Sequence, residues 1–402
     1  FRFVDGRQTA VSREKAMLRF LGRQVCEARV YFAENAVRRV ELSVYNKGDA
    51  GALDREAFER LVGELKRATA AVLGDAGLTG KTSNDRANYF VKRHLWVKRA
   101  THVQLEWAYV DQHRSGGVGV PYGAEYVAVL MMPGRQGGDG ATALGGGLAS
   151  TRPKGARAIR ENVVRCAGGD VRIENVPMVD QGQKGYCAAA SSERVLRYYG
   201  LEVDQHQVAQ LANTAAEGGT TLEGMAKAIG KIGRQFQLDK KDLISSETDG
   251  SFERSDHVKL IELYNETAGK RRKPTVDWHA YVQNNMVDLL AVWRAMDPDV
   301  LRETRNGQRQ AKAQLQRYVK SYVDQGVPLL WSCLVGQYRE DPPLGGDGVF
   351  GHVRLIIGYN DATREVLYSD AWGPQHALKR LPLDDVWAMT KGLIVLKPRD
   401  VR

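Results

Sequence analysis

The sequence predicts an α+β protein of two domains, and three observations carry this prediction. Strand-like alternation and one amphipathic helix fill the first part of the chain, a glycine-rich stretch follows, and beyond it helical periodicity gives way to apolar, strand-like runs. The 402 residues are also long for one core, since domains usually hold about 100 to 200 residues. We expect a smaller α+β domain at 1–132, a linker at 133–160 and a second domain at 161–402.

The first domain should hold a small antiparallel sheet backed by a helix. Runs that alternate apolar and polar residues, as half-exposed strands do, lie at 28–32, 40–45, 102–110 and 126–132. The amphipathic helix is expected from Asp54 to Leu73, with Gly74 as its stop.

No catalytic pattern is evident in this domain. We interpret its histidines as surface or packing residues: His94, His102 and His113. Its role stays open between partner binding, substrate docking and inhibition.

The chain after the linker is organised around NVPMVDQGQKGYCAAASSERVLRYYG, residues 175–200. Residues 176–179 read as a strand-like approach, a polar turn follows, and a helix is expected to begin at or just before Cys187 and to end at Gly200. A helix N-terminus carries the positive end of the helix dipole, which favours a thiolate over a thiol. Cys187 is therefore placed for nucleophilic chemistry.

Gln181 lies six positions before Cys187. A side-chain amide beside a nucleophile can stabilise a developing oxyanion by about 2.7–4 kcal/mol per donor. Gln181 is the first candidate for this role, and Gln183 is the alternative.

A base and its orienting partner are expected far downstream. His352 opens the apolar run VRLIIGY, which reads as a buried strand, and Asp370 stands at the end of the return strand at 366–369. A histidine and an acid on one hairpin would lie side by side, as a cysteine nucleophile requires. His376 is the rival base, but it lies in a loop after Pro374.

Together these motifs resemble the papain-like cysteine peptidases, and more closely their bacterial branch typified by bacteriocin-processing (double-glycine) peptidases. The resemblance rests on Gln181-x5-Cys187 opening a helix, Gly351-His352 opening a strand, and the sequence DAWG that begins at Asp370. It covers roughly residues 171–398. Two features depart from the family pattern: Ala188 stands where many relatives have glycine, and the nucleophile helix has no tryptophan.

The resemblance implies a fold and an activity. It implies a papain-like two-lobe catalytic domain, with a helical lobe that holds the cysteine helix and a C-terminal antiparallel sheet lobe. It also implies a peptidase that acts through a thioester, with Gln181 as oxyanion donor, Cys187 as nucleophile, His352 as base and acid, and Asp370 as its orienting partner. Trp372 would then shield the histidine and the acid.

The same constellation also serves other thiol acyl-transfer enzymes, namely amidases, ubiquitin-like-tail hydrolases and transglutaminase-like proteins. A non-catalytic binding module is disfavoured, because all four expected positions are filled. The substrate would be a protein or peptide. The pair Gly145-Gly146 in the linker resembles a double-glycine cleavage site, so self-cleavage there is one hypothesis.

Further elements fill the second domain. Short helices are expected from Asp204 and around Leu222, followed by a helical insertion at about 245–310 that we interpret as a cap or lid. A helix at 312–323, a strand at 327–334, a loop that adjoins His352, a helix at 381–390 and a strand at 393–396 complete it.

Composition excludes several classes. The formal charge of +10 would suit an acidic partner, but it is spread along the chain and no nucleic-acid motif accompanies it. Four scattered cysteines without CxxC spacing indicate neither a disulfide framework nor a zinc site, and no cofactor or metal is expected. No run is long enough and apolar enough to span a membrane. Because the numbering begins at Phe1, any leader would already be removed, and we favour a secreted or periplasmic location over a cytoplasmic one.

Overall fold

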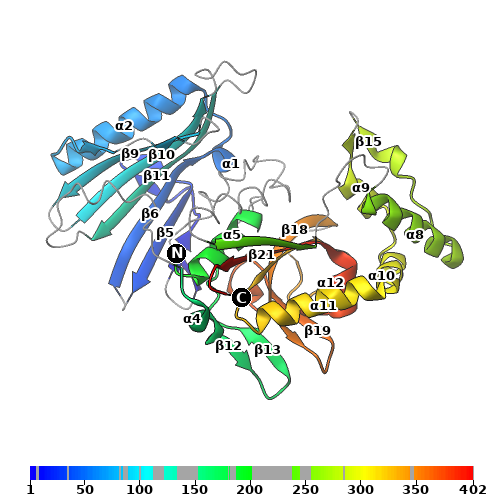
Figure 1. The fold of residues 1–402 in the computed structure, drawn as a ribbon. Coiled ribbons are helices and arrows are strands. Elements are labelled where there is room, and N and C mark those ends of the chain that lie inside the picture. Colours follow the sequence, from blue (N-terminus) through cyan, green and yellow to red (C-terminus); the bar gives the residue numbers. More distant parts are fainter. Residues whose placement is uncertain are drawn as a thin grey trace. The chain divides into compact units, whose positions relative to one another are not determined.

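The computed structural model describes most of the chain, and the described residues fall into two compact units (Figure 1). The first unit takes in those up to Pro133, and the second takes in those from Pro153 onward. The described residues are 1–5, 9–33, 36–80, 83–84, 89–98, 101–111, 122–133, 153–179, 181, 187–201, 238–244, 255–283, 286–344 and 348–401. Several predicted features lie outside them: most of the linker, His113, Gln183, the helices expected at Asp204 and Leu222, and the start of the insertion.

The first unit is built on one antiparallel sheet with the strand order β1-β2-β5-β6-β11-β10-β9-β7, in which β8 also pairs with β9. The elements before and within it are β1 (Arg2–Asp5), β2 (Thr9–Ser12), β3 (Arg19–Phe20), β4 (Arg23–Gln24), β5 (Glu27–Ala33), β6 (Ala36–Asn46), α1 (Lys47–Ala50), β7 (Leu78–Thr79), β8 (Ser83–Asn84), β9 (Tyr89–Lys98), β10 (Thr101–Asp111) and β11 (Tyr122–Pro133). The four predicted strands are confirmed as parts of β5, β6, β10 and β11. Strand β9 was not predicted, because Lys92 and Arg93 interrupt its apolar pattern; Arg93 pairs with Glu106 of β10 at 2.5 Å.

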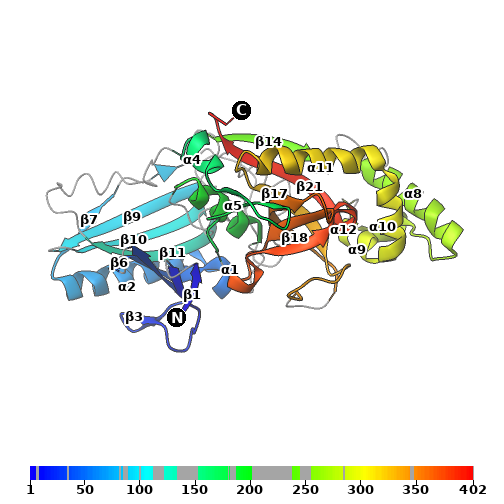
Figure 2. The same ribbon diagram turned by 90° about the horizontal axis from the view of Figure 1, so that it is seen from below.

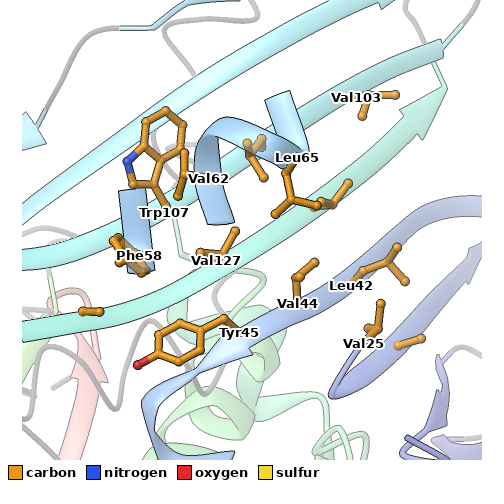
Figure 3. Packing of buried hydrophobic residues seen from close by; sticks show 14 of the residues in the cluster. Val25, Leu42, Val44, Tyr45, Phe58, Val62, Leu65, Val103, Trp107 and Val127 are labelled. Atoms are coloured by element: carbon orange, nitrogen blue, oxygen red, sulfur yellow. The ribbon is translucent and has the colours of Figure 1, made fainter. Parts of the chain in front are cut away.

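Helix α2 (Arg55–Leu73) packs its apolar face on this sheet, as its periodicity predicts. The Asp54 side chain caps its start, and Gly74 ends it in the left-handed conformation with φ of 62°. Figure 3 shows the packed side chains, among them Phe58, Val62 and Leu65 of the helix. The opposite face of α2 is exposed to solvent. Packing on the sheet therefore accounts for the role of this helix in the first unit.

The second unit is built on a second antiparallel sheet, with the order β12-β13-β18-β17-β21-β14 and with β19 joining β18 to β20. Its strands are β12 (Val163–Arg165), β13 (Asp170–Ile173), β14 (Leu238–Ile244), β17 (Leu329–Val335), β18 (Phe350–Asn360), β19 (Glu365–Ser369), β20 (Lys379–Pro382) and β21 (Thr390–Pro398). The strands predicted at 327–334, 353–359, 366–369 and 393–396 are confirmed in β17, β18, β19 and β21. Strand β17 is buried at every residue, because it lies between β18 and β21.

Helices α4 (Ala156–Arg160), α5 (Cys187–Tyr198), α11 (Arg309–Val323) and α12 (Leu383–Met389) accompany this sheet. Helix α5 packs on β18, and α11 packs on β18, β17 and β13 (Figure 2). The helix predicted at 381–390 is shorter than expected, because residues 379–382 pair with β19 as a strand instead.

The approach to Cys187 differs from the prediction. Residues 174–179 form no strand. The carbonyl of Pro177 accepts a hydrogen bond from the Arg194 side chain on α5 at 2.8 Å, so a side chain rather than a neighbouring strand satisfies it. The strand-like interpretation of 176–179 is therefore wrong.

The described part of the predicted insertion is mainly helical, and its apolar residues form a buried cluster that Leu334 of β17 joins. It comprises α8 (Asp256–Arg271), η3 (Trp278–Tyr281), β15 (Val282–Gln283), β16 (Met286–Val287), α9 (Leu289–Arg294) and α10 (Pro298–Gly307). Tyr264, Trp293 and Leu301 are buried together in this cluster. No helix within the described ranges is both long and apolar enough to cross a membrane.

Candidate active site

Cys187 is the first residue of α5. Ala188, Ala189 and Ala190 follow it, and these strong helix formers are small enough to be buried on every side. The thiol is half-buried, and the imidazole of His352 lies close enough to lower its pKa. The sulfur thus lies at the positive end of a helix dipole with a histidine beside it.

His352 and Asp370 meet because β18 and β19 form an antiparallel hairpin. Leu355 of β18 pairs with Ser369 of β19, so the chain reaches Asp370 just beyond the last pair. His352 Nε2 lies 2.8 Å from Asp370 Oδ1, and both residues are buried. Because Nε2 faces the carboxylate, Nδ1 is the ring nitrogen left for the sulfur of Cys187.

The pKa shifts of these groups favour a thiolate beside an imidazolium. Burial raises the pKa of Cys187, but its hydrogen bond to His352 and the charge of that ring outweigh burial and lower the pKa. Burial lowers the pKa of His352, but Asp370 and Cys187 outweigh it and raise the pKa. Burial likewise raises the pKa of Asp370, but Arg354, followed by His352, brings it down to about 2. Asp370 is therefore ionised across the neutral range.

Trp372 covers the histidine. Its ring stacks on that of His352, with centroids 4.2 Å apart and planes 8° from parallel. Phe350 meets the edge of His352 with ring centroids 6.3 Å apart. These rings limit the access of water to the hydrogen bond between His352 and Asp370, which strengthens it.

Gln181 lies at the same end of the sheet. Its backbone N–H donates to the carbonyl of Ala371 at 2.8 Å, one residue from Asp370, and Gln181 is buried. Val179, two residues earlier, packs with Ala190 and Ala371 in a small apolar cluster. Val179 therefore packs between α5 and the residues that follow β19, and Gln181 is hydrogen-bonded to the latter.

His376, the rival base, has different surroundings. It ends the short helix η4 (Pro374–His376), and its ring meets the edge of Trp372 with centroids 5.9 Å apart. Within the described residues, its buried Nδ1 has no hydrogen-bond partner. Burial and the charge of Lys379 lower its pKa. His352, by contrast, has a carboxylate partner.

Arg194, which joins the cysteine helix to the acid, was not predicted from the sequence. Arg194 lies seven residues after Cys187 on α5 and is fully buried. It donates to the backbone carbonyl of Asp370 at 2.9 Å and to Ser369 Oγ at 2.5 Å. The sequence did offer one indication of it. Arg194 is a charged residue on the cysteine helix, and it lies between the alanines at 188–190 and the apolar pair Val195 and Leu196.

The buried charges next to Asp370 were not predicted either. Arg354 Nε lies 3.1 Å from Asp370 Oδ1, and Glu340 and Lys379 complete a buried group. A charged residue inside the apolar run VRLIIGY was the available signal for Arg354. No set of three or more potential ligands is placed to hold a metal ion within the part of the chain that the structure describes.

Comparisons with known proteins give a family for this arrangement. The sequence profile of the Peptidase C39-like family matches residues 173–395, over half of the chain and the part that holds Cys187, His352 and Asp370. No curated protein matches the chain. Among solved structures, the chain is similar to xylellain, a cysteine protease from Xylella fastidiosa, at 11% identity and a TM-score of 0.28, with 62% of this chain and 91% of that chain covered. On the family match, the chain belongs to the Peptidase C39-like family and is a cysteine peptidase.

Proposed function

We propose that the chain hydrolyses peptide bonds through a triad of Cys187, His352 and Asp370. One observation carries the proposal: the thiol at the start of α5 is close enough to the imidazole of His352 for the two to shift each other's pKa, and Nε2 of that imidazole lies 2.8 Å from a buried carboxylate oxygen of Asp370. A nucleophile, a base and an orienting acid in this order are what acyl transfer by a cysteine requires.

The reaction follows from the protonation states. The thiolate of Cys187 attacks the carbonyl carbon of the scissile amide, and the carbonyl oxygen becomes an oxyanion. The Gln181 side-chain amide and the backbone N–H of Cys187 would stabilise that oxyanion. The imidazolium of His352 then donates its proton to the leaving amine, which departs and leaves a thioester.

The second half of the reaction regenerates the enzyme. Neutral His352 takes a proton from a water molecule, which attacks the thioester carbonyl. The acid product leaves, and the proton returns the thiolate and imidazolium pair to its starting state. Asp370 keeps the imidazole oriented and stabilises its positive charge throughout.

The proposal extends to the domain organisation. Residues 161–402 would form a papain-like catalytic domain of two lobes, with α5 in the helical lobe and β17, β18 and β21 in the sheet lobe. Residues 1–132 would be an accessory domain. Self-cleavage at Gly145-Gly146 in the linker would release one from the other, and intact-mass spectrometry before and after incubation tests it.

Alkylation of cysteines by iodoacetamide tests the triad without knowledge of the substrate. At about pH 6, where an ordinary thiol is almost entirely protonated, Cys187 should be alkylated at least about 100-fold faster than Cys166. His352→Ala should remove this difference. Cys166 is the matched control, because it is also half-buried and lies in the same unit.

Peptide hydrolysis then separates the possible reactions. Cys187→Ala should abolish cleavage of a casein-type protein substrate, and Cys166→Ala should leave it unchanged. Transfer of the acyl group to an added amine in preference to water would indicate a transglutaminase-like enzyme instead. Full cleavage by Cys187→Ala would exclude the proposed mechanism.

A further inference from the structure

A buried group of four charges includes Asp370, the acid that faces the imidazole of His352. It contains two acids and two bases: Glu340, Asp370, Arg354 and Lys379. Their side chains are at most 1% exposed. Glu340 lies in the loop after β17, Arg354 in β18, and Lys379 opens β20, so three separate segments supply the partners of Asp370. We call these four residues the charge cluster.

Glu340 is the centre of the charge cluster. Arg354 Nη2 donates to both of its carboxylate oxygens, at 2.9 and 3.0 Å, and Lys379 Nζ lies 2.9 Å from Oε2. The hydroxyl of Tyr368 donates to the same Oε2 at 2.6 Å. Glu340 thus holds both cations in place.

The two cations in turn face Asp370. Arg354 Nε lies 3.1 Å from Asp370 Oδ1, the same oxygen that faces His352 Nε2, and Lys379 Nζ lies 4.0 Å from Oδ2. Both carboxylate oxygens of Asp370 therefore have a cation within 4.0 Å. This arrangement restrains rotation of the carboxyl group.

Stability alone does not explain such a cluster. Removing charges from water is costly, and a buried ion network is commonly no more stabilising than apolar residues of the same volume. Among the influences that lower the pKa of Asp370, the charge of Arg354 is the largest and exceeds that of His352. The cluster therefore acts on the carboxyl group that orients the base.

The charge cluster also ties the loop after β17 to the active site. Lys379 Nζ donates to the carbonyl of Pro342 at 2.8 Å, two residues from Glu340. The chain from this loop continues into Phe350 and His352 of β18. Displacement of Glu340 would therefore move the partners of Asp370.

This inference rests on the proposed function: we propose that Glu340, Arg354 and Lys379 are positioning residues. Together with Asp370 they form a charge-balanced cluster that keeps Asp370 ionised, orients it toward His352, and couples the loop at 336–344 to the triad. The pKa values of Cys187 and His352 should therefore depend on the net charge of the charge cluster. Other charged or titratable groups face it from every neighbouring element: Arg194 of α5, Cys333 of β17, Tyr368 of β19 and His376 of η4.

The sign of the response distinguishes this role from a merely structural one. Glu340→Gln removes a buried negative charge and leaves the cluster net positive, so both pKa values of the Cys187 and His352 pair should fall. Lys379→Met leaves it net negative, so both should rise. Each shift should be about one pH unit, as expected for a charge several ångströms away at an effective dielectric constant near 20. The double variant is balanced again and should return toward the parent.

The experiment uses the full chain and two readouts. The first readout is the pH dependence of Cys187 alkylation by iodoacetamide, with the alkylated residue identified by peptide mass spectrometry. It reports the acid-side pKa of the Cys187 and His352 pair. The bell-shaped profile of kcat/KM for peptide hydrolysis gives both limbs. Glu365→Gln is the matched control, because Glu365 pairs with Arg380 in a half-exposed position on β19 and should shift neither limb. Circular dichroism identifies variants that do not fold.

Opposite shifts in the two single variants, cancelled in the double variant, would support the proposal. Shifts in the same direction, or no shift in folded variants, would overturn it. If one single variant does not fold, the sign of the other still decides. Activity that survives Cys187→Ala would instead remove the proposed function. If Cys187→Ala abolishes activity but neither charge change shifts the pH profile, only this inference is wrong and the proposed function stands.

Discussion

His94 in the first unit and His352 in the second are buried histidines of antiparallel sheets, each beside a tryptophan. The rings of His94 and Trp96 lie 4.5 Å apart, and those of His352 and Trp372 lie 4.2 Å apart. Their hydrogen-bond partners differ. His94 meets the carbonyl of Ala76 at 2.8 Å and the hydroxyl of Thr79 at 3.3 Å.

His352 instead lies between a thiol and a carboxylate. A carbonyl and a hydroxyl hold a ring in place but do not titrate in the neutral range, so His94 is explained by packing. A thiol and a carboxylate exchange protons with the ring or stabilise its charge. Burial of a histidine is thus no indication of chemistry by itself, whereas the partners of its two nitrogens are.

The largest expected effect contrasts these two histidines directly. His352→Ala should lower kcat/KM for peptide hydrolysis by about 10⁴-fold, since it removes the proposed base and proton donor. His94→Ala should change kcat/KM by less than about twofold while it destabilises the first unit by about 1–3 kcal/mol through unpaired polar groups. Kinetics and thermal unfolding of both variants measure this. A large kinetic effect of His94→Ala would contradict the comparison.

The partner of each ring should matter next. Asp370→Asn should lower kcat/KM by about 10³-fold, because the amide no longer stabilises the imidazolium. It should also move the alkaline limb of the pH profile to lower pH, since Asp370 raises the pKa of His352. Thr79→Val beside His94 is the control and should leave the profile in place. An unchanged alkaline limb in Asp370→Asn would show that another group orients the base.

Stability at acid pH should separate the two histidine sites as well. The pKa of Asp370 in the folded chain, about 2, lies below its ordinary value near 4, so its stabilisation is complete above about pH 4 and is lost as the pH falls toward 2. The pKa difference corresponds to about 2.5 kcal/mol. Urea unfolding of the parent and of Asp370→Asn between these pH values measures the contribution. Equal pH slopes for the two proteins would argue against an ionised Asp370 in the fold.

Substitution of the two tryptophans, Trp372 and Trp96, should give the smallest effects on catalysis. Trp372 should matter for kcat/KM, and Trp96 should matter for stability. Trp372 is half-buried and stacks on the ring of His352, so Trp372→Ala should lower kcat/KM by about tenfold by admitting water. Trp96 is 1% exposed, so Trp96→Ala should cost about 3–5 kcal/mol of stability without a change in kcat/KM at a temperature where it is folded. The crossed pattern is the test, and similar kinetics for both variants would refute it.

Local patterns in the sequence accounted for much of the fold. Helix α2 follows from its amphipathic period and its Asp54 and Gly74 ends, and the start of α5 follows from the alanines after Cys187. Strand β9 was missed because its cations hide the alternation. Residues 176–179 were mistaken for a strand, because an apolar run does not reveal that a side chain satisfies the backbone.

For the candidate site, the sequence by itself determined the order and local setting of its residues. A cysteine that opens a helix, a histidine that opens an apolar strand and an acid that ends the next strand are products of short-range propensity and period. A hairpin also brings residues on its two strands together without further information. These features made Cys187, His352 and Asp370 recognisable as one group.

Only the tertiary structure decided what surrounds them. Arg194 reaches Asp370 across 176 positions of sequence, and Glu340 reaches Arg354 from a loop. The physical reason is that a buried charge takes whichever partner the packed strands and loops place beside it, and that choice depends on register and packing. The support of the acid therefore could not be read from the chain, although the acid itself could.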